Sequence, residues 1–180
     1  MTQIVHYPLT LRVPKKKEFR TPFPVRSPLQ TAEVIKDLLH GKIICDVGCS
    51  RGDMVLQFAK YAKFAFGINN DEHESEIARK RGAAVIVDDA MTMEVPYADY
   101  YFFYWGPGDA TPFLEKMYES HPHPFTILAS GHEDQKFLKE YAERWNASKI
   151  ITFRYREKET CDLGLGPRRG HWRLVVLEKE

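Results

Sequence analysis

The chain has 180 residues, of which 43% are hydrophobic and 28% charged, and its formal net charge is +1. A chain of this length can bury the core of one ordinary domain, and this composition excludes intrinsic disorder. A net charge so close to zero gives no overall attraction to nucleic acid or to an anionic membrane.

The cysteines and the apolar runs indicate the compartment. Cys45, Cys49 and Cys161 are an odd number without a short repeat spacing, which argues against a disulfide framework. No apolar run approaches the ~20 residues that span a bilayer, and the first twenty residues lack the apolar stretch of a signal peptide. We therefore expect a cytoplasmic protein with no membrane span.

Residues 1–28 are predicted to form an extended N-terminal arm, because they contain five prolines. The arm is also basic and includes the run 15–17, which consists of three lysines. A charge run of this kind usually marks a solvated segment, and docking of an acidic partner is the alternative. A single domain is predicted to follow over residues 29–180.

From residue 29 onward the apolar residues first follow helical spacing, and short apolar runs then alternate with helical patterns. The predicted helices cover residues 29–39, 54–62, 71–81, 111–119 and 133–145. The predicted strands cover residues 42–47, 63–68, 83–87, 99–104, 125–130, 150–155 and 172–177. This alternation predicts an α/β fold with right-handed crossovers and a mostly parallel seven-stranded sheet that ends in an antiparallel hairpin. Ligands of such sheets bind at the carboxyl ends of the strands.

The turn after the first predicted strand of this domain carries the chemistry. It reads Asp46-Val47-Gly48-Cys49-Ser50-Arg51-Gly52 and leads into a helix. Gly48 and Gly52 permit backbone angles and a close approach that a Cβ would prevent. The spacing fits neither the dinucleotide-binding Gly-x-Gly-x-x-Gly nor the phosphate loop. A carboxylate just before the turn favours a ligand with a positive end over a pyrophosphate.

This segment resembles the first motif of the class I S-adenosylmethionine (SAM)-dependent methyltransferases, Asp/Glu-x-Gly-x-Gly-x-Gly, with Ser50 in place of the middle glycine. The resemblance implies a Rossmann-like methyltransferase sandwich with SAM as cofactor. It implies cofactor contacts from the residues of the motif, namely Asp46, Gly48, Cys49, Ser50 and Gly52.

Two further cofactor contacts are implied by the same resemblance. Asn69, in Gly67-Ile68-Asn69, stands where the family has an acid that holds the ribose hydroxyls. Its amide oxygen can accept a hydrogen bond but lacks the charge-assisted strength of a carboxylate, and Asp71 or Glu72 could substitute for it. Asp89, rather than Asp88, resembles the acid that contacts the adenine amino group, with loop capping as the alternative interpretation.

The segment after the fourth predicted strand usually faces the methyl acceptor. Residues 98–107 resemble those of small archaeal protein-lysine methyltransferases and of mitochondrial relatives that modify an ATP synthase subunit. Tyr104 and Pro107 match their pattern, whereas Trp105 and Gly106 depart from it. The resemblance implies SN2 methyl transfer to a lysine amine of a protein substrate. Tyr104 and Trp105 are the predicted catalytic residues, because aromatic faces hold sulfonium or ammonium groups.

Alternatives to this interpretation remain at the level of the sequence. Tyr104 and Trp105 could simply pack at the end of a strand. The acceptor could be RNA, bound through the basic arm, or a small molecule. The chain could also be a degenerate, non-catalytic module with the same fold. No metal site is predicted, because the pair His121 and His123 has no carboxylate partner.

Overall fold

The computed structural model describes residues 3–7, 27–104, 110–157 and 168–180. The strands are β1 Gln3–Tyr7, β2 Ile43–Val47, β3 Phe64–Asn69, β4 Val85–Val87, β5 Tyr100–Phe103, β6 Phe125–His132, β7 Lys149–Glu157 and β8 Arg168–Lys179. The helices are α1 Gln30–Val34, α2 Lys36–Leu39, α3 Asp53–Phe58, α4 Glu72–Lys80, α5 Thr111–Ser120 and α6 Lys136–Arg144. Within the described residues, no helix is both long enough and apolar enough to cross a membrane.

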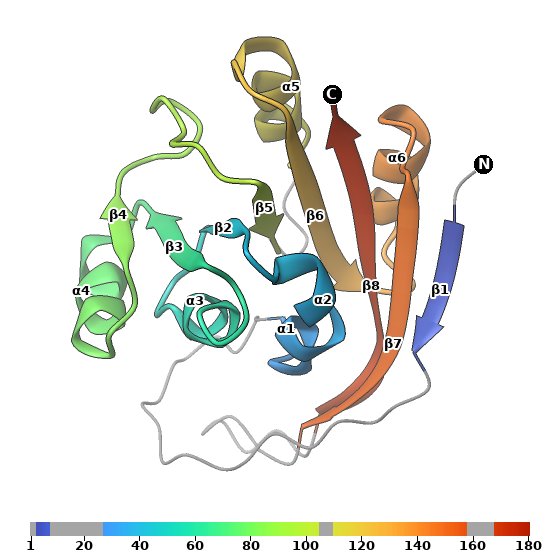
Figure 1. Ribbon diagram of the computed structural model, residues 1–180, viewed down its shortest axis with the longest axis horizontal. Coiled ribbons are helices and arrows are strands. Elements are labelled where there is room, and N and C mark those ends of the chain that lie inside the picture. The colour runs from blue at the N-terminus through green and yellow to red at the C-terminus, as the bar shows by residue number, and fades with distance from the viewer. Residues whose placement is uncertain (1–2, 8–26, 105–109, 158–167) are drawn as a thin grey trace.

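All of the strands belong to one sheet, in the order β1-β7-β8-β6-β5-β2-β3-β4 (Figure 1). β8 runs antiparallel to both of its neighbours, β6 and β7, and every other pairing is parallel. The seven strands β2 to β8 confirm the predicted sheet and its closing hairpin. The eighth strand, β1, was not predicted; it comes from within residues 1–28 and pairs with β7.

The alternation of side chains along the strands divides the core between the two faces of the sheet. Ile44, Phe102 and Leu128 share one core cluster with buried residues of α1, α2 and α3. Their chain neighbours Cys45 and Tyr101 point to the other face and pack with residues of α5 and α6. Figure 1 shows α1 to α3 on one side of the sheet and α5 and α6 on the other. The buried strands therefore read as continuous apolar runs.

Three predicted helices differ from the observed ones, and one of them, predicted over 54–62, ends already at Phe58. The helix predicted over 29–39 is interrupted at Ile35, whose φ of −105° and ψ of 12° separate α1 from α2. The helix predicted from residue 133 begins only at Lys136, because β6 continues to His132 and pairs there with Trp172.

The β7–β8 hairpin continues beyond the end of β6. The last pair between β6 and β8 is His132↔Trp172, whereas β7 and β8 stay paired from Arg154↔His171 to Glu157↔Arg168. We call these eight residues, 154–157 and 168–171, the hairpin extension. Since β6 and β7 run in the same direction, the extension projects past the carboxyl edge of the sheet, as seen at the bottom of Figure 1.

Candidate functional site

The turn after β2 has the backbone conformation that the glycine motif predicts. Gly48, Ser50 and Gly52 all lie in the left-handed region, with φ of 79°, 46° and 76°. The amide nitrogens of Gly48 and Cys49 donate to the Ile68 carbonyl at 2.8 and 3.2 Å, which ties the turn to β3. Ser50 thus adopts a conformation that glycine adopts without strain. The turn is a defined structure at the carboxyl edge of the sheet.

Asp46 lies directly below this turn and is buried, with 5% of its surface exposed. No hydrogen bond or ion pair to its carboxyl group occurs among the residues that the structure describes. Burial raises its pKa to about 8, and the negative charge of Asp53 adds to the effect. A buried carboxyl group without a partner is costly, and a cationic ligand group would compensate it.

The turn is braced from the side by α4. The guanidinium of Arg51 donates twice to the Glu74 carboxylate, from Nε at 2.8 Å and from Nη2 at 3.0 Å. The Ser50 hydroxyl donates to the same carboxylate at 3.0 Å. The serine that replaces the family's middle glycine is therefore held toward Glu74. Asp71 caps α4 by accepting from the Glu74 amide at 2.9 Å.

Cys49 has a packing role in the turn. A Cβ on Gly67 would lie 2.3 Å from the Cys49 Sγ atom, so the thiol occupies the space above a strand glycine. Burial raises the pKa of the Cys49 thiol, which keeps it protonated and unreactive. The backbone of Cys49 is also occupied, because its amide donates to the Ile68 carbonyl and its carbonyl accepts from the Gly52 amide at 2.8 Å.

Asn69 ends β3 and is 9% exposed. Its amide nitrogen donates to the Asp71 carbonyl at 3.1 Å and to the Ser75 hydroxyl at 3.3 Å. Its Oδ1 atom has no hydrogen bond within the described part of the chain. The amide is thus oriented with its oxygen left as an acceptor. Asp71 is occupied as the helix cap, and Glu72 is exposed.

Asp89 stabilises the loop that follows β4. Its Oδ1 atom accepts from the Met91 amide at 2.9 Å, and its carbonyl accepts from the Met93 amide at 2.9 Å. The Asp88 carboxylate accepts from the Asp89 amide at 2.7 Å. Lys116 of α5 fixes the same loop by donating to the Ala90 carbonyl at 2.7 Å. The loop-capping alternative therefore holds for one oxygen of Asp89, which is half-buried beside the end of β4.

Of the two predicted catalytic residues, Tyr104 lies at the end of β5 and Trp105 lies outside the described residues. The Tyr104 ring is half-buried and packs edge-on against Trp172, with centroids 5.0 Å apart. The His132 ring packs against the same indole at 4.7 Å. Trp172 is fully buried and donates from Nε1 to the Ser130 hydroxyl at 3.2 Å. One indole therefore supports two partly exposed rings at the carboxyl edge.

Sequence spacing alone does not predict this aromatic cluster. Trp172 lies nearly 70 residues after Tyr104, and only the pairing of β8 with β6 brings it there. The predicted arm reaches the same place, because the Ser27 hydroxyl is 2.9 Å from that of Ser130. His121, by contrast, is a core residue whose Nε2 atom lies 3.1 Å from the Tyr101 hydroxyl. No group of residues suited to a metal ion occurs among the described residues.

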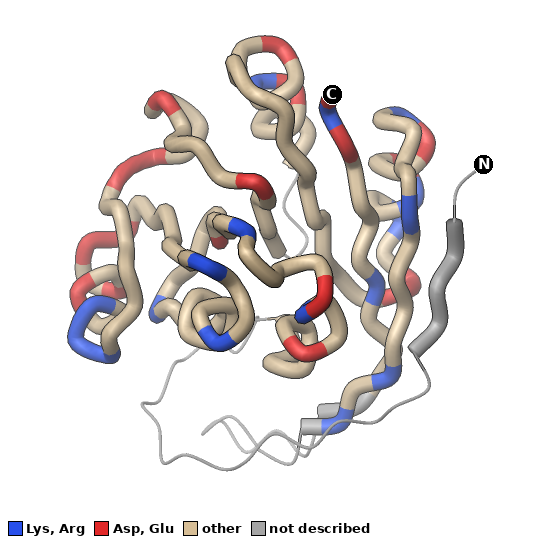
Figure 2. Tube along the Cα trace, in the orientation of Figure 1, with Lys and Arg blue, Asp and Glu red and all other residues tan. Residues whose placement is uncertain are grey.

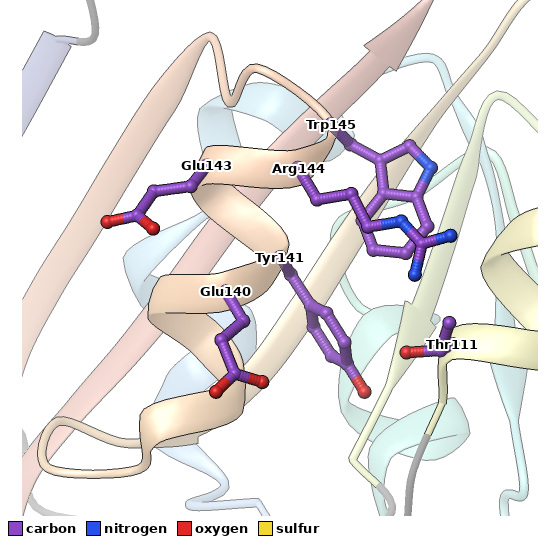
Figure 3. A pocket seen from close by; sticks show the side chains of 6 residues that line it. All are labelled: Thr111, Glu140, Tyr141, Glu143, Arg144 and Trp145. Carbon is purple, nitrogen blue, oxygen red and sulfur yellow. The ribbon is translucent and has the colours of Figure 1, made fainter.

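A separate cleft of about 470 Å³ lies between α5 and α6 (Figure 3). Six residues line it: Thr111, Glu140, Tyr141, Glu143, Arg144 and Trp145. The Arg144 guanidinium is 4.6 Å from the centroid of the Trp145 ring and also pairs with Glu115. The Tyr141 hydroxyl accepts from the Ala110 amide at 2.8 Å. Tyr141 and Arg144 therefore hold α6 against α5 and the residue before it.

No family model matches the chain, and no curated protein matches its sequence. Solved structures do match. The C-terminal domain of precorrin-6Y C5,15-methyltransferase from Rhodobacter capsulatus is 14% identical, with a TM-score of 0.62 over 87% of this chain and 92% of that one. A SAM-dependent methyltransferase from Thermotoga maritima is 14% identical, with a TM-score of 0.54 over 84% and 89%.

A dimethyladenosine transferase from Plasmodium falciparum is 15% identical, with a TM-score of 0.56 over 84% of this chain and 61% of that one. At such identities the likeness establishes the fold. The chain therefore has the Rossmann-like α/β fold of the class I methyltransferases, as predicted.

Proposed function

We propose that this protein is a SAM-dependent methyltransferase whose cofactor site is the turn between β2 and α3. The fold, shared with solved methyltransferases, supports the proposal. So does the position of the turn, since ligands of open α/β sheets bind outside the carboxyl ends of the strands.

The observation that carries the proposal is the buried and unpartnered carboxyl group of Asp46. It is 95% buried beneath a turn of left-handed residues, and no described residue neutralises or hydrogen-bonds it. Phosphate ligands would be repelled by an ionised carboxylate at this position. A ligand with a cationic ammonium group would be attracted, and SAM carries one.

The remaining residues fit the other parts of this cofactor. The free Oδ1 atom of Asn69 would accept from a ribose hydroxyl, and Asp89 would accept from the adenine amino group. When bound, SAM supplies a methyl group on a cationic sulfur, and an amine can displace that methyl in line. The Tyr104 ring would bind the cationic groups at the reacting end, at about 0.5–2 kcal/mol per contact.

Titration calorimetry with SAM tests the cofactor site. Wild type should bind, and Asp46→Asn should weaken binding at least tenfold, because a charge-assisted contact contributes about 1.5–3 kcal/mol. Asp37→Asn, which alters an exposed carboxylate on α2, is the matched control and should bind like wild type. Absence of wild-type binding at millimolar SAM would leave only the non-catalytic module.

The acceptor is a finer question. A protein lysine is the acceptor that the resemblance around Tyr104 implies, and an amine of RNA or of a small molecule fits the same fold. The chemistry is common to these acceptors, because each needs a neutral amine aligned with the transferred methyl group.

Incubation of the protein and methyl-labelled SAM with cell extract, followed by protease or nuclease, separates these acceptors. Label in a macromolecule that only protease releases would support the lysine. Label that only nuclease releases would identify nucleic acid, and label that passes a small-pore filter untreated would identify a small molecule. Asp46→Asn provides the background incorporation.

A further inference from the structure

We infer that Glu74 is a positioning residue of the cofactor site, which holds Ser50 in the left-handed backbone conformation of the turn. This role rests on the proposed function, because it concerns the shape of the turn that would bind SAM. Three features carry it: the backbone of Ser50, three hydrogen bonds that the turn donates to one carboxylate, and the contacts that fix this carboxylate on α4.

The backbone of Ser50 has an energetic cost that the two glycines of the turn do not have. Its φ of 46° lies in the left-handed region, which glycine adopts freely and which a residue with a Cβ adopts only against steric repulsion. Among the described residues, the other non-glycine residue with a positive φ is Asn146, and asparagine tolerates this region better than serine does. Such a conformation persists where the surrounding contacts determine it. Ser50 therefore needs contacts that hold it in place.

Glu74 supplies these contacts through both of its carboxylate oxygens. Its Oε2 atom accepts from the Ser50 hydroxyl at 3.0 Å and from Nε of Arg51 at 2.8 Å, while its Oε1 atom accepts from Nη2 of Arg51 at 3.0 Å. A guanidinium that donates twice to one carboxylate forms a strong and directional contact. The Arg51 and Glu74 side chains are only 12% and 22% exposed, so solvent screens this pair less than a surface pair. Two consecutive residues of the turn are thus tied to one carboxylate.

The start of α4 connects this carboxylate to the second cofactor-binding element, the end of β3. The Glu74 amide donates to the capping carboxylate of Asp71 at 2.9 Å. The Asp71 carbonyl and the Ser75 hydroxyl in turn accept from the Asn69 side-chain amide, at 3.1 and 3.3 Å. The helix start that orients Asn69 therefore also anchors Glu74. As a result, the turn has a fixed position relative to the proposed ribose contact.

A general stabilising effect on α4 does not account for these contacts. Acidic residues near the start of a helix interact favourably with its dipole, and Figure 2 shows acidic residues at the start of α4 and basic ones at its end. Glu72 and Glu74 both lie in the first turn of α4, so both have this effect. Glu72 is exposed, and no contact between it and the cofactor turn occurs in the described part of the chain. The three hydrogen bonds from the turn are specific to Glu74.

Titration calorimetry with SAM and with methylthioadenosine, which lacks the amino-acid part of SAM, tests this role. Glu74→Gln keeps the size of the side chain, but an amide cannot accept from Arg51 at both of its atoms. SAM binding should weaken at least tenfold, because the turn above Asp46 would lose its conformation. Methylthioadenosine should bind within twofold of wild type. Glu76→Gln is the matched control on α4, where Glu76 is exposed and pairs with Lys80, and it should bind both ligands like wild type. Equal weakening of both ligands by Glu74→Gln would overturn the inference.

Substitutions of Ser50 provide a rescue that a merely structural role of Glu74 would not show. Ser50→Gly removes the Cβ, and glycine needs no contact to adopt the left-handed conformation. Added to Glu74→Gln, it should restore SAM binding at least threefold. Ser50→Ala keeps the Cβ but loses the hydroxyl, so it should weaken SAM binding at least threefold even with Glu74 present. If Ser50→Gly gave no gain in the Glu74→Gln protein, the conformation of Ser50 would not be what Glu74 maintains, and the inference would fail.

The conformation of Ser50 can also be measured without SAM, which separates this inference from the proposed function. The Cα and Cβ chemical shifts of Ser50 in the isotope-labelled protein report its backbone angles. Glu74→Gln should move these shifts toward the values of extended backbone, and Glu76→Gln should not. Moved shifts in a protein that does not bind SAM would support the hold of Glu74 on the turn and refute the cofactor site. Unmoved shifts in a protein that binds SAM would overturn the positioning role and leave the cofactor site intact.

Discussion

Asp46 makes a prediction about stability as well as about binding. Its folded pKa of about 8 exceeds the value near 3.8 of an unperturbed aspartate. A carboxyl group with a raised folded pKa contributes stability that is fully present below pH ~4 and is lost as the pH rises to 8. Asp46→Asn removes the ionisable group and with it this loss of stability at high pH. The variant should therefore exceed wild type in the free energy of unfolding by about 5 kcal/mol at pH 8, and by about 2 kcal/mol at pH 5.

Urea unfolding at the two pH values measures this difference. Asp37→Asn should show none of it, since that carboxylate is exposed. A gain for Asp46→Asn that is the same at pH 5 and pH 8 would contradict the assigned cause. Such a residue lowers the free energy of unfolding but improves cofactor binding. This combination is typical of a binding site and not of a purely structural turn.

Asn69 should not tolerate the acid that the family carries. Its amide nitrogen donates to the Asp71 carbonyl and to Ser75, so a carboxylate in its place would set oxygen against oxygen at the start of α4. We expect Asn69→Asp to lower the free energy of unfolding by about 1–2 kcal/mol and to weaken SAM binding. The exposed neighbour Asn70→Asp is the control for both measurements. Tighter SAM binding by Asn69→Asp would show that the carboxylate is free to face the ribose.

At the scale of residues, local motifs were predictable and distant partners were not. The left-handed turn with Gly48 and Gly52 follows from the sequence, because only a few residue types adopt that backbone. The contact of Cys49 with Gly67 does not, since it depends on the register of β2 and β3. The contact of Trp172 with Tyr104 and His132 could not be predicted for the same reason, because it depends on how the strands pair in the sheet.

At the scale of elements, a side chain at Gly52, the residue before α3, is disfavoured for two separate reasons. Its φ of +76° disfavours a side chain, and a Cβ would lie 2.8 Å from the Ala83 Cβ atom and 3.1 Å from that of Ala78. Gly41 has a similar φ of +73° and nothing within 4 Å. Gly41→Ala should therefore cost only backbone strain, about 1–2 kcal/mol. Gly52→Ala should cost about 1–3 kcal/mol more, from overpacking against α4.

Thermal or urea unfolding of the two glycine variants gives the comparison. Equal losses in the free energy of unfolding would mean that α4 moves aside without cost. The contact between α4 and the turn would then be weak. A larger loss for Gly52→Ala, together with weaker SAM binding, would show that the α4 contact positions the turn.

Strands were predicted better than helix ends because each strand is a short apolar run between punctuating residues. The helix over 29–39 looked continuous because its apolar spacing continues through Ile35, where the backbone leaves the helical region. The predicted strand 125–130 is shorter than β6 because Gly131 and His132 are not typical strand residues. Their pairing with β8 extends the strand. β1 was missed because its five residues carry no helix or turn signal and their partner, β7, lies far along the chain.

At the scale of the whole molecule, β1 changes which strand forms the edge of the sheet. It pairs in parallel with β7 from Gln3↔Lys149 to Tyr7↔Phe153, and thereby covers five of the nine residues of β7. β7 presents Ile151, Phe153 and Tyr155 to the core. A long and apolar strand with an open edge invites pairing with another chain. The short β1 therefore protects the first five residues of β7, 149–153, and the hairpin extension lies beyond it.

Removal of residues 1–7 should open that edge. We expect the truncated protein to keep its monomeric fold at low concentration, to lose a few kcal/mol or less of stability, and to self-associate as its concentration rises. Light scattering coupled to size-exclusion chromatography measures the self-association, with a truncation of residues 1–2 as control. The cofactor turn follows β2, which is separated from β7 by β8, β6 and β5 in the sheet. SAM affinity should therefore not change. A truncated protein that stays monomeric at all concentrations would mean that β7 needs no cover.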